Sequence, residues 1–166
     1  MTQLELLRLL VNRRLVTLPN CLRGIVVTSL LWAGFTQASL AQQGEHPTAD
    51  LLSELIRIDT SNPPGNESKI AEFLAARLRP LGFDIQIVPT PEPGKAHFIA
   101  RLKGDGSKRP VLLAAHADVV GVEKEKWTVD PFGGVIRDGY VYGRGAIDFK
   151  GGLAVFTQAV VRLAKE

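Results

Sequence analysis

The sequence is poor in cysteine, since its 166 residues contain only Cys21. That residue lies in an N-terminal leader that we expect to be removed, so the mature chain would contain no cysteine. Disulfide bonds and thiolate metal ligands are then excluded, and a metal site must use nitrogen and oxygen ligands. The length and the hydrophobic content of 45% are those of a chain that can bury a core.

The mature chain also lacks an excess of charge of either sign. The formal net charge of +3 at pH 7 comes from residues 1–41, where four arginines outweigh one glutamate. The remainder holds 16 basic and 16 acidic residues and is neutral. No basic cluster is left that would bind a phosphate backbone, so we expect no nucleic-acid partner.

Residues 1–41 have the pattern of a secretory signal peptide. Three arginines precede an apolar run over residues 25–35, and the small residues Ser39 and Ala41 stand where a signal peptidase reads the chain. We predict cleavage after Ala41, a secreted or periplasmic mature chain, and no stable membrane insertion after cleavage. An uncleaved anchor is the alternative, although a spanning helix needs about 20 apolar residues.

A polar linker over residues 42–47 is expected to precede a folded region over residues 48–166. Apolar residues three and four positions apart predict helices there, and alternating apolar and polar residues predict half-buried strands. Asp138-Gly139 is typical of a hairpin turn. The expected helices cover residues 49–58, 67–81 and 153–163, and the expected strands cover residues 83–87, 97–103, 111–115, 135–136 and 140–142.

This order of elements predicts an α/β fold, a three-layer sandwich of helices on a mixed, mostly parallel sheet. Residues 111–115 (VLLAA) are uniformly apolar, as expected of a strand that is covered on both faces. We therefore place this strand inside the sheet.

The first candidate site residues follow that strand directly. His116 and Asp118 stand at its carboxyl end, which is where ligands bind in open α/β sheets. Alternation along the strand would place both side chains on the same side. The carboxylate could then fix the tautomer of His116 and raise its basicity as a metal ligand. The alternative is a surface histidine with a carboxylate neighbour.

A glycine-rich segment over residues 143–152 (GRGAIDFKGG) contains one acidic residue, Asp148. Glycine lets the backbone approach a ligand closely or adopt positive φ. The order of residues that defines a phosphate-binding loop is absent. Two interpretations stay open on the residues alone: a ligand-binding loop, or an ordinary strand-to-helix loop that is capped by Asp148.

Together the segments HADVV, WTVDPF and DGYVYGRGAIDFKGG, with SNPPG before them, resemble the zinc-dependent family of aminoacylases, glutamate carboxypeptidases, acetylornithine deacetylases and succinyl-diaminopimelate desuccinylases. The resemblance implies that residues 48–166 are the N-terminal part of a di-metal peptidase catalytic domain. It makes His116 a ligand of one metal ion and Asp148 the bridging ligand of both. It makes Asp118 the active-site carboxylate that orients His116.

The resemblance also implies two divalent ions, zinc or in its place cobalt or manganese, and hydrolysis of a peptide or N-acyl amino acid by a metal-activated water. Arg144 and Lys150 lie in the same motif, and we assign them structural roles in the loop.

Several parts of the family site have no counterpart up to Glu166. They are a Glu-Glu pair that supplies the general base and a ligand, a further acidic ligand, a distant histidine, and a small lid or dimerisation domain. We therefore expect a truncated chain that is inactive alone, from an enzyme that could be a homodimer. The alternatives are a non-catalytic remnant and a secreted peptide-binding module.

Overall fold

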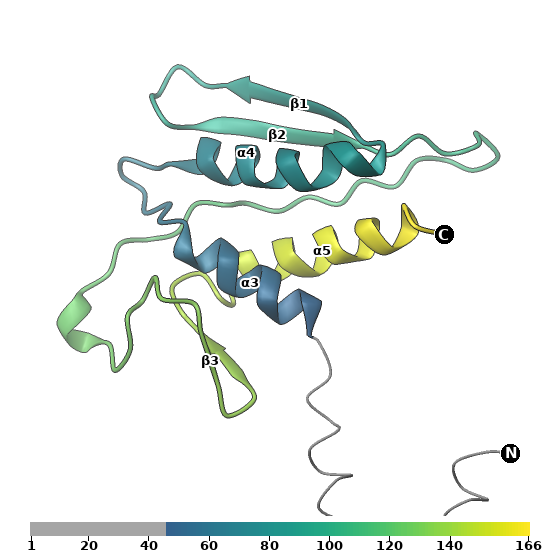
Figure 1. Cartoon of the computed structure of the whole chain (residues 1–166). Helices are drawn as coiled ribbons and strands as arrows, with labels where there is room; N and C mark the ends of the chain where they lie inside the picture. Colours follow the sequence, from purple (N-terminus) through teal and green to yellow (C-terminus); the bar gives the residue numbers. More distant parts are fainter. Residues whose placement is uncertain (1–45) are drawn as a thin grey trace, which may run out of the picture. The chain divides into compact units, whose positions relative to one another are not determined.

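A computed structural model describes residues 46–166. The predicted signal peptide and all but the last two residues of the predicted linker lie outside this range, so these predictions stay untested. The elements in chain order are α3 (Pro47–Arg57), α4 (Glu67–Leu78), the 3₁₀ helix η1 (Arg79–Leu81), β1 (Asp84–Pro89), β2 (Ala96–Arg101), the 3₁₀ helix η2 (Lys124–Lys126), β3 (Val135–Arg137), β4 (Tyr140–Tyr142) and α5 (Lys150–Leu163) (Figure 1).

The helices begin and end where local chemistry allows. Helix α3 begins at Pro47. Proline is tolerated in a first turn because the N–H that it lacks would have no hydrogen-bond partner within the helix. Asn66 occupies the N-cap position of α4, although its side chain makes no capping hydrogen bond. The chain leaves η1 at Gly82, which adopts the left-handed conformation with φ of 84°. No helix within residues 46–166 has both the length and the apolar character needed to cross a membrane.

The core lies where the apolar faces of the three α-helices meet. Each fully buried aliphatic side chain contributes about 1.5–3 kcal/mol, whereas a typical hydrogen bond contributes about 0.5–1.5 kcal/mol. Packing of these side chains is therefore the main interaction that holds the helices together. The buried residues of this cluster are Leu51 and Leu55 of α3, Ile70 and Leu74 of α4, and Ala154 of α5.

Two antiparallel hairpins complete the described part. Strand β1 pairs with β2 in a register that places Ile87 opposite Phe98, and this hairpin packs on α4. Strand β3 pairs with β4 through the predicted turn, where Asp138 and Gly139 have φ of 54° and 80°. The hairpin prediction is therefore confirmed.

The described residues do not form the mostly parallel, three-layer arrangement that we expected. Both sheets within residues 46–166 are two-stranded and antiparallel, and parallel pairing is limited to one bridge between Ser61 and Val119. Within residues 46–166 the α/β prediction is confirmed to the extent that helices and strands are combined.

Residues 111–115 explain the difference. They run as an extended segment between α4 and α5 (Figure 1), without a backbone hydrogen bond to any described residue. Val111 and Leu112 are 84% and 88% exposed. A strand enters a parallel sheet only when neighbouring strands pair with it and helices cover both faces. No strand within residues 46–166 pairs with residues 111–115. The prediction that this segment is buried is therefore wrong.

The unpaired segment predicts fast amide hydrogen exchange. Without hydrogen-bond partners, the amides of residues 111–115 should exchange at nearly the rate of an unstructured peptide, while those of β1 and β2 are protected. Hydrogen exchange measured by NMR on the purified chain checks this directly. Protection of residues 111–115 equal to that of β2 would contradict it and would favour the paired strand expected from the sequence.

Candidate metal centre

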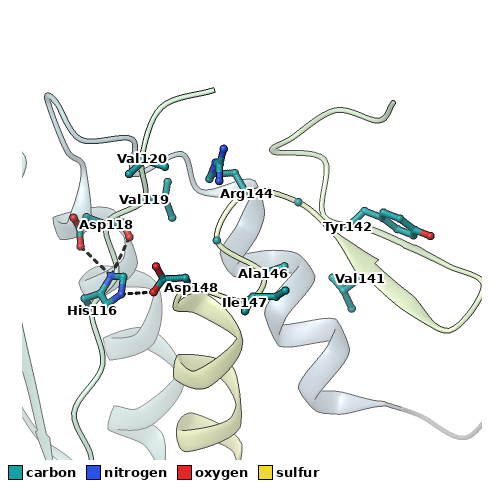
Figure 2. A pocket seen from close by; sticks show the side chains of 12 residues that line it. His116, Asp118, Val119, Val120, Val141, Tyr142, Arg144, Ala146, Ile147 and Asp148 are labelled. Carbon is teal, nitrogen blue, oxygen red and sulfur yellow. Dashed lines mark hydrogen bonds and ion pairs between the residues drawn. The ribbon is translucent and has the colours of Figure 1, made fainter. Parts of the chain in front are cut away.

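The structure brings the three predicted site residues together around one imidazole ring. Nδ1 of His116 lies 3.1 Å from Oδ1 of Asp118 and 3.2 Å from the backbone oxygen of the same residue. Nε2 of His116 lies 2.9 Å from Oδ1 of Asp148. Figure 2 shows the ring between the two carboxylates. The predicted placement of His116 and Asp118 on one side of the chain agrees with this geometry.

The two carboxylates raise the pKa of His116 above its ordinary value of 6.5. The hydrogen bond to Asp148 is the largest cause, and the hydrogen bonds and charge of Asp118 act in the same direction, while partial burial opposes them. A protonated ring donates from both nitrogens, so it satisfies both carboxylates at once. The metal-free site therefore favours an imidazolium.

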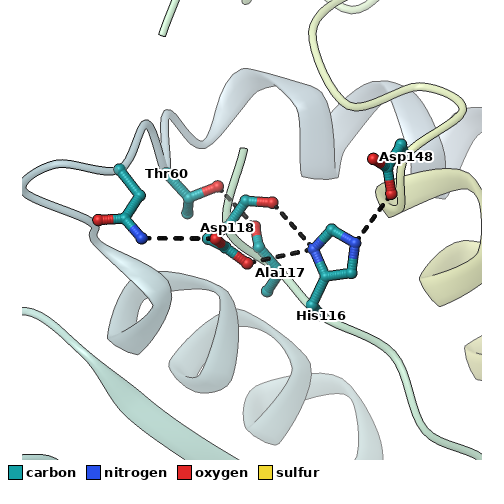
Figure 3. A network of polar contacts seen from close by, with 6 residues as sticks. Thr60, His116, Ala117, Asp118 and Asp148 are labelled. Atoms are coloured by element: carbon teal, nitrogen blue, oxygen red, sulfur yellow. Dashed lines mark hydrogen bonds and ion pairs between the residues drawn. The ribbon is translucent and has the colours of Figure 1, made fainter. Parts of the chain in front are cut away.

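The loop over residues 59–65 holds the segment that carries His116 and Asp118. The N–H of Val119 donates to the oxygen of Thr60 at 3.1 Å, and the N–H of Asn62 donates to the oxygen of Val119 at 2.9 Å. The buried hydroxyl of Thr60 donates to the oxygen of Ala117 at 2.6 Å (Figure 3). The Asn62 amide lies 3.5 Å from Oδ2 of Asp118. These contacts fix the backbone on which both side chains stand.

Sequence reasoning missed these supporting residues. Two prolines and a glycine exclude helix and sheet over residues 59–65, so none of the expected elements covers them. The available signal was the presence of SNPPG among the segments that carry the family resemblance.

The glycine-rich segment places Asp148 by close packing. Gly145 has φ of 83°, and a Cβ there would lie 2.6 Å from Cγ1 of Val119. A Cβ on Gly151 would overlap the backbone oxygen of Ala146. Only glycine fits these two positions, so α5 can begin at Lys150, three residues earlier than predicted.

Asp148 does not cap α5. The N-cap residue is Phe149, and no side chain caps that helix end. The Asp148 carboxylate instead contacts His116, while its side chain stays 84% exposed. The interpretation of Asp148 as a helix cap is therefore wrong, and the carboxylate is free to accept a further ligand.

Arg144 and Lys150 make the structural contacts that we expected of them. The Arg144 guanidinium lies over the Trp127 ring, 5.3 Å from its centroid. Lys150 is fully buried, and its ammonium donates to the oxygens of Leu55 at 3.0 Å and Ile58 at 2.7 Å. Burial lowers the pKa of Lys150 to about 8, and the charge of Asp59 acts against this shift.

The three site residues face an open hollow of about 400 Å³, whose other wall is the loop over residues 143–147. Their chemistry fits a zinc site: with Nδ1 bonded to a carboxylate, Nε2 is the nitrogen that would bind a metal ion, and Asp148 would supply an oxygen ligand. Residues 46–166 hold no group of three or more His, Cys, Asp or Glu side chains placed to bind one ion.

Comparisons with known proteins find one matching family and several similar relatives. Residues 112–166 match peptidase family M20/M25/M40. The chain is 40% identical to aminoacylase-1 of Sus scrofa over 133 residues, which cover 78% of this chain and 32% of that protein. It is 39% identical to a succinyl-diaminopimelate desuccinylase of Methylorubrum extorquens over 119 residues, which cover 70% of this chain and 30% of that protein. It is 42% identical to the succinyl-diaminopimelate desuccinylase of Rhodospirillum centenum over 115 residues, which cover 66% of this chain and 28% of that protein.

The matched family consists of metal-dependent amidohydrolases that act on C–N bonds. More narrowly, residues 112–166 match peptidase family M20/M25/M40, whose members typically bind two zinc ions. The resemblance stated from the sequence is thus confirmed. The chain spans about a third of the length of the relatives that it matches.

The contacts of His116 predict that the stability of the metal-free fold depends on pH. Because its folded pKa is raised, the metal-free fold gains stability from the charged ring below the unfolded pKa of 6.5. It loses that contribution as the pH rises through the folded pKa. Asp148→Asn removes the carboxylate whose hydrogen bond is the largest cause of the raised pKa of His116. The substitution should therefore lower this pKa toward 6.5.

NMR titration of the His116 ring in metal-free protein measures this change. The ring resonances of His46 and His97 are internal controls, and they should not respond to the substitution. An unchanged His116 midpoint in Asp148→Asn would contradict the contact between Nε2 and Asp148.

Proposed function

We propose that this chain forms one side of the di-metal centre of a hydrolase that cleaves the amide bond of a peptide or an N-acyl amino acid. The observation that carries the proposal is the placement of His116, with Asp118 at Nδ1 and Asp148 at Nε2. A carboxylate–histidine pair directed at a second carboxylate is the arrangement that orients a histidine ligand toward a metal ion.

Each residue has a distinct task in this proposal. His116 presents Nε2 as a ligand, and Asp118 accepts a hydrogen bond from the protonated Nδ1, which keeps the ring in the correct tautomer and orientation. Asp148, whose side chain is 84% exposed, would help to hold the ions through its carboxylate. Two bound divalent ions, zinc or alternatively cobalt or manganese, would lower the pKa of a shared water and polarise the amide carbonyl.

The remaining parts of the site are proposed to come from residues outside the described range. A catalytic zinc needs three protein ligands, whereas residues 46–166 offer His116 and Asp148. The general base is likewise proposed to lie elsewhere. The same additional residues would pair with residues 111–115 and complete the mostly parallel sheet expected from the sequence, since an apolar strand this exposed favours burial.

The substrate class rests on the relatives. Their names refer to acylated amino acids in one case and to succinyl-diaminopimelate in the other. The predicted signal peptide favours a peptide or an N-acyl amino acid outside the cytoplasm over a biosynthetic intermediate. Secretion and the homodimeric state of a complete enzyme are part of the proposal and await their own tests.

A second candidate is a peptide-binding or metal-binding module without hydrolytic activity. The incomplete ligand set within residues 46–166 favours it for the chain acting alone. Turnover separates the two candidates: the module hydrolyses no N-acyl amino acid or dipeptide in any context, whereas the hydrolase does so once the remaining ligands are supplied.

The ligand assignment predicts that zinc binding depends on His116. Isothermal titration of the purified chain should show weak zinc binding, with a dissociation constant well above those of complete zinc sites because two ligands are available. His116→Ala should abolish it. His97→Ala is the matched control, because His97 lies on β2 and is not among the residues that face the hollow. Equal zinc binding by His116→Ala and the unmodified chain would contradict the assignment.

A further inference from the structure

Lys150 places a positive charge inside the fold, at the junction of α3 and α5. Its side chain is fully buried, and Nζ donates to the oxygens of Leu55 at 3.0 Å and Ile58 at 2.7 Å. Leu55 lies in the last turn of α3 and Ile58 is its C-cap residue, and backbone oxygens at this end of a helix carry partial negative charge. The nearby charge of Asp59 also favours the ammonium. This end of α3 therefore binds a cation and holds it in place.

The same residue forms the base of the loop that carries Asp148. The N–H of Lys150 donates to the oxygen of Gly145 at 2.9 Å. A Cβ on Gly145 would lie 3.3 Å from Cδ of Lys150 and 2.6 Å from Cγ1 of Val119, so the lysine stem, Gly145 and Val119 are closely packed. Val119 follows Asp118 directly. Lys150 thus contacts Gly145 in the loop that positions Asp148, and Gly145 in turn packs against Val119, the neighbour of Asp118.

The two hydrogen bonds of Lys150 hold the first turn of α5 against α3, while other contacts hold the rest of the two helices together. Among the described residues, one other side-chain hydrogen bond joins α5 to α3, from Nε2 of Gln158 to the oxygen of Pro47 at 3.1 Å. It lies toward the end of α5 that is farther from Asp148. The apolar core holds the middle of the same pair of helices. Loss of the lysine would therefore free the first turn of α5 while the helices stay packed.

We propose that Lys150 is a positioning residue for the metal site. By tying the first turn of α5 to the C-terminal carbonyls of α3, it holds the Asp148 carboxylate opposite Nε2 of His116. The inference rests on the proposed function, because it takes His116 and Asp148 as ligands of a metal ion. It goes beyond that function in naming a buried contact between α3 and α5 that sets the distance between the two ligands.

The test compares three variants of the full chain. Lys150→Met keeps the length of the side chain but removes the charge and the donors, and Lys150→Arg keeps both. Ala154→Gly is the matched control, since it loosens the buried interior of α5 one turn away without altering the contacts of Lys150. Zinc affinity is measured by titration calorimetry at fixed pH, and stability is measured by urea unfolding.

Lys150→Met should weaken zinc binding at least tenfold, about the lower limit for loss of a group that orients a ligand. Lys150→Arg should recover most of that loss. Ala154→Gly should lower the urea midpoint but leave the zinc affinity within about twofold of the unmodified chain. If Lys150→Met does not fold, Lys150→Gln takes its place with the same thresholds, since it removes the charge and keeps only the two N–H donors of its amide.

A readout without metal separates failure of this inference from failure of the proposed function. The ring ¹⁵N chemical shifts of His116, recorded at one pH in metal-free protein, report the hydrogen bond between Nε2 and Asp148. Lys150→Met should move them toward those of Asp148→Asn, while Ala154→Gly should not. If the unmodified chain binds no zinc, the proposed function fails and these shifts alone decide the role of Lys150. Shifts and zinc affinity that follow stability equally in Lys150→Met and Ala154→Gly would overturn the inference.

Discussion

The imidazole of His116 is the contact on which the proposed site depends. It joins Asp118, two residues away, to Asp148, which lies 32 residues further along the chain. A ring with a carboxylate at each nitrogen has one orientation that satisfies both. The surrounding structure therefore has to fix two backbone segments independently. Thr60 and the loop around it fix the first segment, and Gly145 with Lys150 fixes the second.

Local sequence patterns predicted the elements that depend on local interactions. Apolar periodicity placed all three α-helices, and the Asp138-Gly139 turn placed the second hairpin, because turn geometry requires residues that tolerate positive φ. The start of α5 was missed, since Gly151 and its neighbours indicated a loop. Glycine is required there because the first helical turn packs against Ala146, which is a contact that no local pattern reveals.

The predictions that failed depend on distant parts of the chain. The apolar sequence of residues 111–115 indicated a buried strand, but burial needs partner strands, and none pairs with it within residues 46–166. In the site, alternation alone placed His116 and Asp118 on one side. The proximity of Asp148 was expected only from the family resemblance. The contacts of Lys150 join residues more than 90 positions apart, so the sequence identified the residue but not its partners.

The central claim is that His116 binds a metal ion through Nε2 while Nδ1 stays protonated against Asp118. Long-range ¹H–¹⁵N correlation spectra of the His116 ring in the zinc-loaded chain test this most directly, because they distinguish a protonated nitrogen from a metal-bound one. The account predicts a proton on Nδ1 and zinc-induced shifts at Nε2, with both features lost in Asp118→Ala. Zinc bound at Nδ1, or a ring spectrum that zinc does not change, would contradict it.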